Sequence, residues 1–140
     1  TLRDRVCAVS NKTHYNEMNV LSMHALIGAY QSQGYEWVDE LNQVLAGNIE
    51  YFCTYAEKHW KGVAFSRPQG TYMVFLDCTE WCLEHGRDIQ WLLDEGARVG
   101  VGYQDGRPFH GPCHIRVNLA LPLSRVKEAC DRLDRYVFGV

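Results

Sequence analysis

Long apolar runs are absent from this 140-residue sequence. No stretch approaches the roughly 18 consecutive apolar residues that a membrane-spanning helix requires. The net charge is −3 and the lysines and arginines form no cluster, so the electrostatic pattern of a nucleic-acid-binding protein is missing. The sequence therefore predicts a soluble, cytoplasmic protein that has neither a nucleic acid nor a membrane as its partner.

Motifs that mark a self-sufficient active site are also missing. The sequence has no HExxH pair, no serine in a nucleophile elbow and no glycine-rich loop that leads from a strand into a helix. Its six cysteines include no CxxC pair, and the adjacent Cys113 and His114 would point to opposite sides of a strand, which argues against zinc. We therefore expect reduced thiols, no metal site and no catalytic residue within this chain.

Helical patterns fill the first 60 residues. Residues 19–34 are apolar around most of a helix, as in a helix buried on several sides, and Gly34 is a suitable end. Apolar residues at helical spacing then predict a helix of about 24 residues, roughly 36 Å long, ending at Trp60. The chain opens at Thr1 without a residue before it that could cap a helix. That start is typical of a segment of a longer protein.

After residue 61 the pattern changes to short strands, turns and helices. Asp88 is a suitable N-cap and Gly96 a suitable end for one helix, and Ser124 is a suitable N-cap for the last helix. The predicted strands are residues 71–77, 98–102 and 114–122. The chain therefore reads as α+β, a two-layer sandwich of a small three-stranded sheet with helices, preceded by a long helix. We divide it into a helical linking segment, 1–60, and a sandwich, 61–140.

The last predicted strand, HIRVNLALP, carries Arg116 at its centre. Alternation places Arg116 on the face opposite the apolar residues Ile115, Val117, Leu119 and Leu121. The Gly/Pro-rich loop before the strand is longer than a plain connection needs. Tyr103 or Phe109 from this loop, beside the planar guanidinium fork, would form one wall of a cleft for a small anion. Simple solvent exposure of Arg116 is the alternative.

Three ordered motifs resemble a known family: RPQGTYMVFLD, GVGYQDGRPFHG and HIRVNLALPLSRVKEACDRL. They are similar to the C-terminal part of class I/II aminotransferases, the fold-type I pyridoxal-phosphate (PLP) enzymes, and most of all to the cystathionine β-lyase-like branch. The upstream segment SMHALIGAYQSQGYEWVDELNQVLAGNIEYF resembles the helix pair that links the two domains of these enzymes. The resemblance implies that residues 1–140 are the C-terminal small domain, without the large PLP-binding domain.

The resemblance also implies roles for individual residues. Arg116 matches the arginine that binds the α-carboxylate of the amino-acid substrate. None of Lys12, Lys58, Lys61 and Lys127 matches the Schiff-base lysine, so we expect this chain alone to be inactive and to bind no PLP. The complete enzyme is expected to be a PLP-dependent homodimer.

Two reactions remain open within this family, transamination and carbon–sulfur β-elimination. Phe109-His110-Gly111 interrupts the aromatic–glycine pair that the family usually has in this loop, which leaves the substrate open as well. An alternative of another class is a stand-alone, non-catalytic α+β module for binding or dimerisation.

Overall fold

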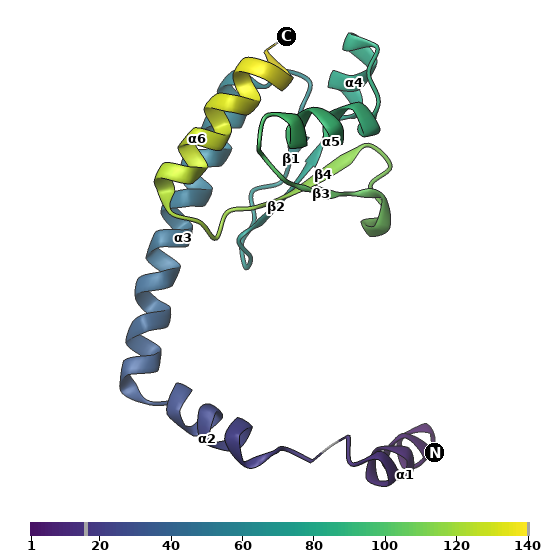
Figure 1. Cartoon of the computed structure of the whole chain (residues 1–140), viewed down its shortest axis with the longest axis vertical. Coiled ribbons are helices and arrows are strands. Elements are labelled where there is room, and N and C mark those ends of the chain that lie inside the picture. Colours follow the sequence, from purple (N-terminus) through teal and green to yellow (C-terminus); the bar gives the residue numbers. More distant parts are fainter. Residues whose placement is uncertain (16, 140) are drawn as a thin grey trace. The chain divides into compact units, whose positions relative to one another are not determined.

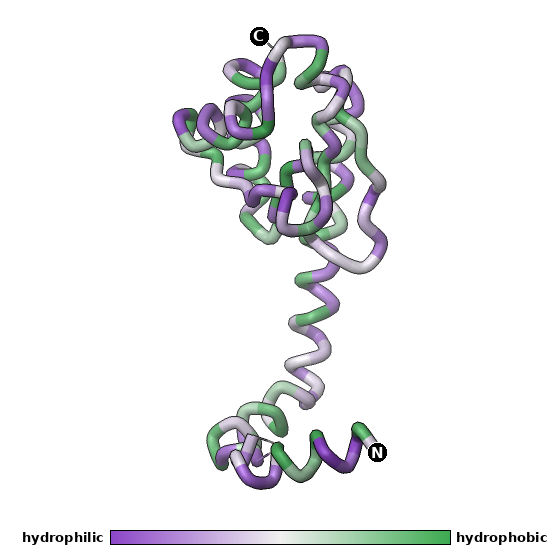
Figure 2. The backbone as a smooth tube through the Cα atoms, turned by 90° about the vertical axis from the view of Figure 1, so that its right-hand side faces the viewer, coloured by the Kyte–Doolittle hydropathy of each residue, from purple (hydrophilic) through white to green (hydrophobic). Residues whose placement is uncertain are grey.

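The structure is a computed structural model that describes residues 1–15 and 17–139. The chain divides into two compact units, Thr1–Glu40 and Leu41–Val140. The long helix α3 (Ser32–His59) begins in the first unit and ends in the second. Its length confirms the predicted long helix. In Figure 2, hydrophobic and hydrophilic stretches alternate along it, as they do in an amphipathic helix.

The first unit contains α1 (Leu2–Thr13), α2 (Val20–Ala29) and the start of α3. The expectation of an uncapped first helix is wrong. The Thr1 hydroxyl accepts a hydrogen bond from the Asp4 backbone N–H at 3.3 Å, and the Asp4 carboxylate accepts one from the Thr1 ammonium group at 2.8 Å. Both contacts satisfy groups at a helix N-terminus that have no partner within the helix.

The predicted helix over 19–34 is shorter in the structure. It ends at Ala29, and Gly34 lies inside α3 instead of ending a helix. A Cβ atom on Gly34 would lie 1.9 Å from the Ala29 carbonyl oxygen, so the glycine permits the close approach of the two helices. The expected burial of this segment is also wrong for the described residues, because α2 has no buried residue.

The second unit contains an antiparallel sheet of four strands in the order β1-β2-β4-β3. The strands are β1 (Ala64–Phe65), β2 (Met73–Asp77), β3 (Gln104–Asp105) and β4 (His114–Asn118). The sheet therefore has one strand more than the three predicted. The expected strand over 98–102 is wrong because Arg98 ends a helix and Gly100 adopts a φ of 75°. The extended chain begins at β3 instead.

Helices and tight turns connect and cover these strands (Figure 1). They are α4 (Thr79–His85), α5 (Ile89–Arg98), the 3-10 turn η1 (Arg107–Phe109), α6 (Leu123–Leu133) and the π-helical turn η2 (Asp134–Phe138). Asp88 caps α5 as predicted, accepting from the Trp91 N–H at 2.8 Å. The prediction for Ser124 is wrong, because the cap position of α6 is Pro122. Gly96 lies within α5 and does not end it.

One face of the sheet forms the hydrophobic core. Val74 and Leu76 of β2 and Ile115 and Val117 of β4 are buried against helical side chains. The helical contributions come from α3, α4, α5 and α6 and include Phe52, Trp81, Leu92, Val126 and Leu133, and Trp60, directly after α3, joins them. In Figure 1, α6 lies beside the C-terminal half of α3, and Lys127 stands 5.2 Å from the centre of the Tyr51 ring. This packing of helices on one side of a sheet confirms the α+β fold.

A buried asparagine fixes the chain where it leaves β4. Asn48 of α3 is 1% exposed. Its Nδ2 donates to the Leu119 carbonyl at 2.8 Å and to the Leu121 carbonyl at 2.7 Å. Leu119 is buried as predicted, whereas Leu121 lies beyond the strand and is 49% exposed, so its predicted place in the core is wrong.

Candidate functional site

Arg116 lies at the centre of β4, between β2 and β3. The register pairs it with Phe75 on one side and with Gln104 on the other. Its neighbours Ile115 and Val117 point into the core, so Arg116 projects from the opposite face and is half-buried there. The alternation that the sequence predicts for this strand is confirmed from residue 114 to residue 119.

Two side chains contact the guanidinium of Arg116. Nη1 donates to Oε1 of Gln104 at 2.8 Å. The Cζ atom lies 4.8 Å from the centre of the Phe109 ring, a distance at which a cation interacts favourably with an aromatic face. Within residues 1–15 and 17–139, Arg116 has no ion pair with a carboxylate. Its positive charge is therefore held in place without being neutralised.

An open cavity of about 550 Å³ lies beside this guanidinium. Its walls come from β2, β3, β4 and the residues that precede β2 and β3: Thr71, Tyr72, Met73, Gly102, Tyr103, Gln104, Arg116 and Asn118. Arg116 is the only charged residue in this lining. Most of the lining surface is polar, and its uncharged polar side chains include those of Thr71, Gln104 and Asn118. The arrangement suits a small anion with a polar or apolar side group.

The Gly/Pro-rich loop places Phe109 over Arg116. Asp105 ends β3, and its carboxylate accepts from the Arg107 backbone N–H at 2.9 Å and pairs with the Arg107 guanidinium at 2.7 Å. These hydrogen bonds lower the pKa of Asp105. The 3-10 turn that follows ends at His110, whose φ of 63° lies in the left-handed region. The turn therefore fixes the position of the Phe109 side chain over Arg116.

Tyr103, the other aromatic candidate, also lines the cavity. Its hydroxyl donates to the Leu92 carbonyl of α5. The ring packs so closely that a Cβ atom on Gly96 would lie 2.5 Å from it, which explains a glycine inside this helix. Burial raises the pKa of Tyr103. Its hydroxyl is therefore a structural group, and Phe109 is the aromatic residue that contacts Arg116.

A histidine and an aspartate extend the same face of the sheet. The His114 ring lies 4.6 Å from the Phe75 ring, and its Nδ1 is 3.8 Å from Oδ1 of Asp77. Burial acts to raise the pKa of Asp77, but hydrogen bonds from the Thr79 hydroxyl and N–H, together with His114, hold it below the ordinary value. The sequence analysis gave neither residue a role, although β2 and β4 alternation alone places both on this face.

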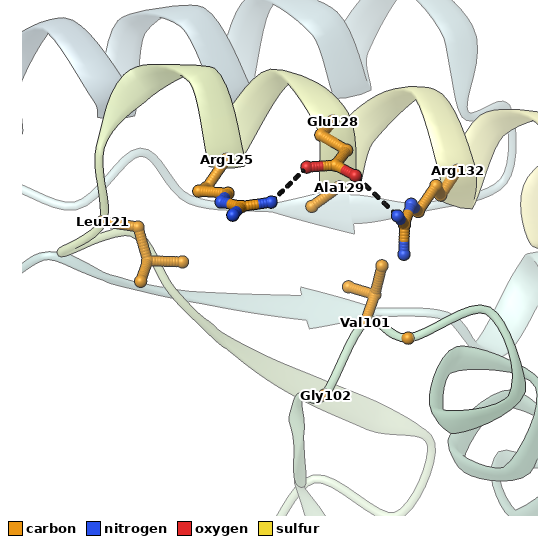
Figure 3. Close-up of a pocket in the computed structure, with 8 residues that line it drawn as sticks. Val101, Gly102, Leu121, Arg125, Glu128, Ala129 and Arg132 are labelled. Atoms are coloured by element: carbon orange, nitrogen blue, oxygen red, sulfur yellow. Dashed lines mark hydrogen bonds and ion pairs between the residues drawn. The ribbon is translucent and has the colours of Figure 1, made fainter.

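A second depression lies between α6 and the loop after α5 (Figure 3). Its volume is about 340 Å³, and it contains two arginines. Both arginines pair with one carboxylate: Glu128 accepts from Arg125 at 2.9 Å and from Arg132 at 2.5 Å. These contacts lower the pKa of Glu128. The Glu128 carboxylate thus engages both guanidinium groups and compensates one of the two charges, whereas no described carboxylate pairs with Arg116, so the cavity at Arg116 is the better candidate for an anionic ligand.

The cysteines do not add a chemical site. All six are free thiols. Burial raises the pKa of Cys82 and that of Cys130 to about 12, so both remain protonated and poorly nucleophilic near neutral pH. No group of three or more His, Cys, Asp or Glu side chains in residues 1–15 and 17–139 is arranged to hold a metal ion. None of the helices described there has the length and apolar character needed to cross a membrane.

Comparison with known proteins places this fold among PLP enzymes. No protein-family model matches the chain. It is 31% identical over 124 residues to "Putative cystathionine beta-lyase" of Mycobacterium leprae (strain TN), which covers 73% of this chain and 28% of that protein. A protein of the same name from Mycobacterium tuberculosis (strain CDC 1551 / Oshkosh) is 28% identical over 131 residues. The match covers 82% of this chain and 32% of that protein. The chain thus spans less than a third of the length of these curated relatives.

Solved structures give the same result. The PLP-bound C–S lyase from Staphylococcus hominis is 25% identical, with a TM-score of 0.77, and the match covers 91% of this chain and 33% of that one. An aspartate aminotransferase variant from Thermus thermophilus shares the fold, with a TM-score of 0.76 at 18% identity, over 91% of this chain and 34% of that one. The resemblance to fold-type I PLP enzymes of the aminotransferase and C–S lyase group is therefore confirmed.

Proposed function

We propose that this chain is the small domain of a PLP-dependent enzyme that acts on amino acids, and that Arg116 binds the α-carboxylate of the substrate. The observation that carries the proposal is the half-buried, unneutralised guanidinium of Arg116 beside an open cavity. A guanidinium has five N–H donors in a planar fork, and one of them is engaged by Gln104. The remaining donors suit a carboxylate, which accepts two parallel hydrogen bonds.

Arg116 acts by positioning the substrate. A carboxylate held by two hydrogen bonds has its plane fixed, so the bonds at the α-carbon point in defined directions. Phe109 and the surrounding sheet exclude water from one side of the guanidinium, which strengthens the interaction. The chain's contribution is thus binding and orientation, and the Tyr103 hydroxyl, held by Leu92, takes no part in proton transfer.

The described residues do not fit a complete PLP site. No lysine lines the cavity at Arg116, so it lacks an amine for the cofactor aldehyde. It also lacks a carboxylate that could pair with the pyridine nitrogen. PLP, where bound, withdraws electrons from the α-carbon of an amino acid. In this proposal the cofactor is held by a large domain outside this chain, residues 1–140 form the small domain, and the complete protein is a homodimer.

Two reactions fit this site. Carbon–sulfur β-elimination is supported by the names of both curated relatives and by the S. hominis C–S lyase. Transamination is supported by the shared fold of the T. thermophilus aminotransferase. The two differ in their products, because elimination from L-cystathionine releases a thiol and transamination transfers the amino group to a 2-oxo acid. We propose elimination as the first of the two, because both mycobacterial relatives are named cystathionine beta-lyases and the S. hominis protein is a C–S lyase.

The test compares the complete gene product with the 140-residue chain. After incubation with PLP and removal of unbound PLP, we expect the complete protein to show a band near the visible edge that shifts on addition of amino acids, and the 140-residue chain to show none. Arg116→Ala in the complete protein should lower kcat/KM by a factor on the order of 30 to 5,000, because removal of one partner of a buried charge pair costs about 2–5 kcal/mol. Arg116→Lys keeps the charge and loses the planar fork. Its kcat/KM should lie between those of the wild type and of Arg116→Ala.

Arg135→Ala is the matched control, because Arg135 is exposed and lies outside the cavity lining. Its kcat/KM should stay within twofold of the wild-type value. A complete gene product that stays colourless with PLP would reject the enzyme and favour a non-catalytic binding or dimerisation module. An Arg116→Ala variant with unchanged kcat/KM would reject the role of Arg116 alone.

A further inference from the structure

The guanidinium of Arg116 is restrained from two directions. Oε1 of Gln104 lies 2.8 Å from Nη1, and Cζ lies over the Phe109 ring, 4.8 Å from the centre of the ring. A free arginine side chain samples many rotamers, and ordering it when a ligand binds reduces the affinity. The hydrogen bond and the ring contact together restrict the position of the guanidinium before the ligand arrives.

The backbone fixes the position of Gln104. Gln104 and Arg116 are directly paired residues of the antiparallel strands β3 and β4. Side chains of such a pair project side by side from the same face of the sheet, so the Gln104 amide lies within hydrogen-bonding distance of the guanidinium. β3 is only two residues long, and its second residue, Asp105, starts the turn that carries Phe109. One short strand therefore directs both contacts.

The chemistry of Gln104 matters as much as its position. Other arginines of this chain are held by carboxylates: Arg67 by Glu50 and Glu57, Arg98 by Glu95, Arg107 by Asp105, and Arg125 and Arg132 by Glu128. An amide oxygen accepts a hydrogen bond but carries no net charge. Gln104 thus restrains Arg116 and leaves its full positive charge available to an anion.

We propose that Gln104 and Phe109 are positioning residues that hold the guanidinium of Arg116 in the orientation that binds a substrate carboxylate. This inference rests on the proposed role of Arg116 in substrate binding. It assigns Gln104 a specific requirement, a neutral hydrogen-bond acceptor, and it assigns Phe109 the requirement of an aromatic ring. Each requirement is tested by a pair of substitutions at the same position that differ in expected effect.

The experiment uses the complete gene product with PLP and two probes, L-alanine and L-alaninamide. The probes share the α-amino group and differ in whether they carry a carboxylate. Apparent dissociation constants come from the change in the visible band. Gln104→Ala should weaken L-alanine binding about three- to tenfold, the usual range for one lost hydrogen bond, and leave L-alaninamide within twofold. Gln104→Glu should weaken L-alanine binding further, because the new carboxylate pairs with Arg116 and competes with the ligand.

Phe109 is tested by a pair of substitutions. Phe109→Leu removes the aromatic face and should weaken L-alanine binding about two- to fivefold, whereas Phe109→Tyr keeps the ring and should restore it. Gln43→Ala is the matched control for Gln104→Ala, because Gln43 is an exposed glutamine on α3. It should leave both dissociation constants unchanged. The Nε–H signal of Arg116 in protein labelled with 15N-arginine, assigned by its loss in Arg116→Ala, should broaden in Gln104→Ala.

The outcomes separate this inference from the proposed function. If Arg116→Ala weakens L-alanine binding and neither Gln104→Ala nor Phe109→Leu does, the positioning roles are wrong and the role of Arg116 stands. An equal loss for L-alanine and L-alaninamide shows a general structural role and also overturns the inference. If Arg116→Ala binds L-alanine as well as the wild type does, both proposals fall. If Gln104→Ala loses its cooperative thermal transition, the L-alanine and L-alaninamide dissociation constants of Gln104→Glu, Phe109→Leu and Phe109→Tyr are judged by the same criteria.

Discussion

Replacement of Asn48 by alanine tests how much the hydrogen bonds to the chain that follows β4 contribute to stability. Asn48 is 1% exposed and donates to the carbonyls of Leu119 and Leu121 at 2.8 and 2.7 Å. Leu119 is 2% exposed, but its carbonyl keeps a second donor, the Leu121 N–H at 2.9 Å, so loss of the bond from Asn48 costs about 0.5–1.5 kcal/mol. Leu121 is 49% exposed and its carbonyl can turn to water, so the second bond adds about 0.5–1.5 kcal/mol. We expect a loss of roughly 1–3 kcal/mol in the free energy of unfolding.

The assay is urea unfolding followed by tryptophan fluorescence, since Trp60 and Trp81 are buried in the same core. Asn42→Ala, an exposed asparagine on the same helix, is the control and should change the free energy of unfolding by less than about 0.5 kcal/mol. Asn48→Asp should be more destabilising than Asn48→Ala near neutral pH, because a carboxylate would face two carbonyl oxygens. A loss below about 0.5 kcal/mol for Asn48→Ala would refute the reasoning.

Two further predictions concern the loop that carries Phe109. His110 adopts a φ of 63°, in the left-handed region. His110→Gly should have a melting temperature equal to or higher than that of the wild type. His110→Val should lower the melting temperature by several degrees, because a β-branched residue is strained at this φ. Arg107 holds the pKa of Asp105 below its ordinary value. A depressed folded-state pKa stabilises the protein above the unfolded pKa, and the contribution is lost as the pH falls below about 4. Asp105→Asn should therefore flatten the acid limb of the stability profile, and an unchanged acid limb would contradict the ion pair.

Sequence periodicity predicted the elements that are long enough to show a period. The amphipathic stripe of α3 and the alternation around Arg116 both extend over several residues. Burial follows the alternation in β4 and the stripe from residue 48 onward, whereas Trp37 and Val44 of the same stripe are 63% and 54% exposed. β1 and β3 have two residues each, too few for alternation to appear. The pattern at 98–102 resembled a strand, but hydrogen bonding at the end of α5 determined its conformation, since the Val101 N–H donates to the Gly96 carbonyl at 2.8 Å.

The glycines were harder to interpret from sequence than the apolar residues. Gly34 and Gly96 both looked like helix ends, yet each lies within a helix where another group approaches closely. A glycine at a helix end and a glycine under an aromatic ring have the same local sequence signal, and only the tertiary contact separates them. The partner of Gly96 is the ring of Tyr103, seven residues later and across a turn.

The surroundings of Arg116 depend on contacts of the same tertiary kind. The sequence predicted the arginine and an aromatic neighbour, but Gln104 enters only through the register of β3 on β4. That register places an uncharged acceptor where a glutamate, nearly identical in size, would have formed another of the arginine–carboxylate pairs that this chain contains elsewhere. A glutamate there would have satisfied the half-buried guanidinium within the domain. With glutamine, one hydrogen bond of the guanidinium is satisfied and its charge is not, which supports the proposed role of Arg116 in binding a carboxylate.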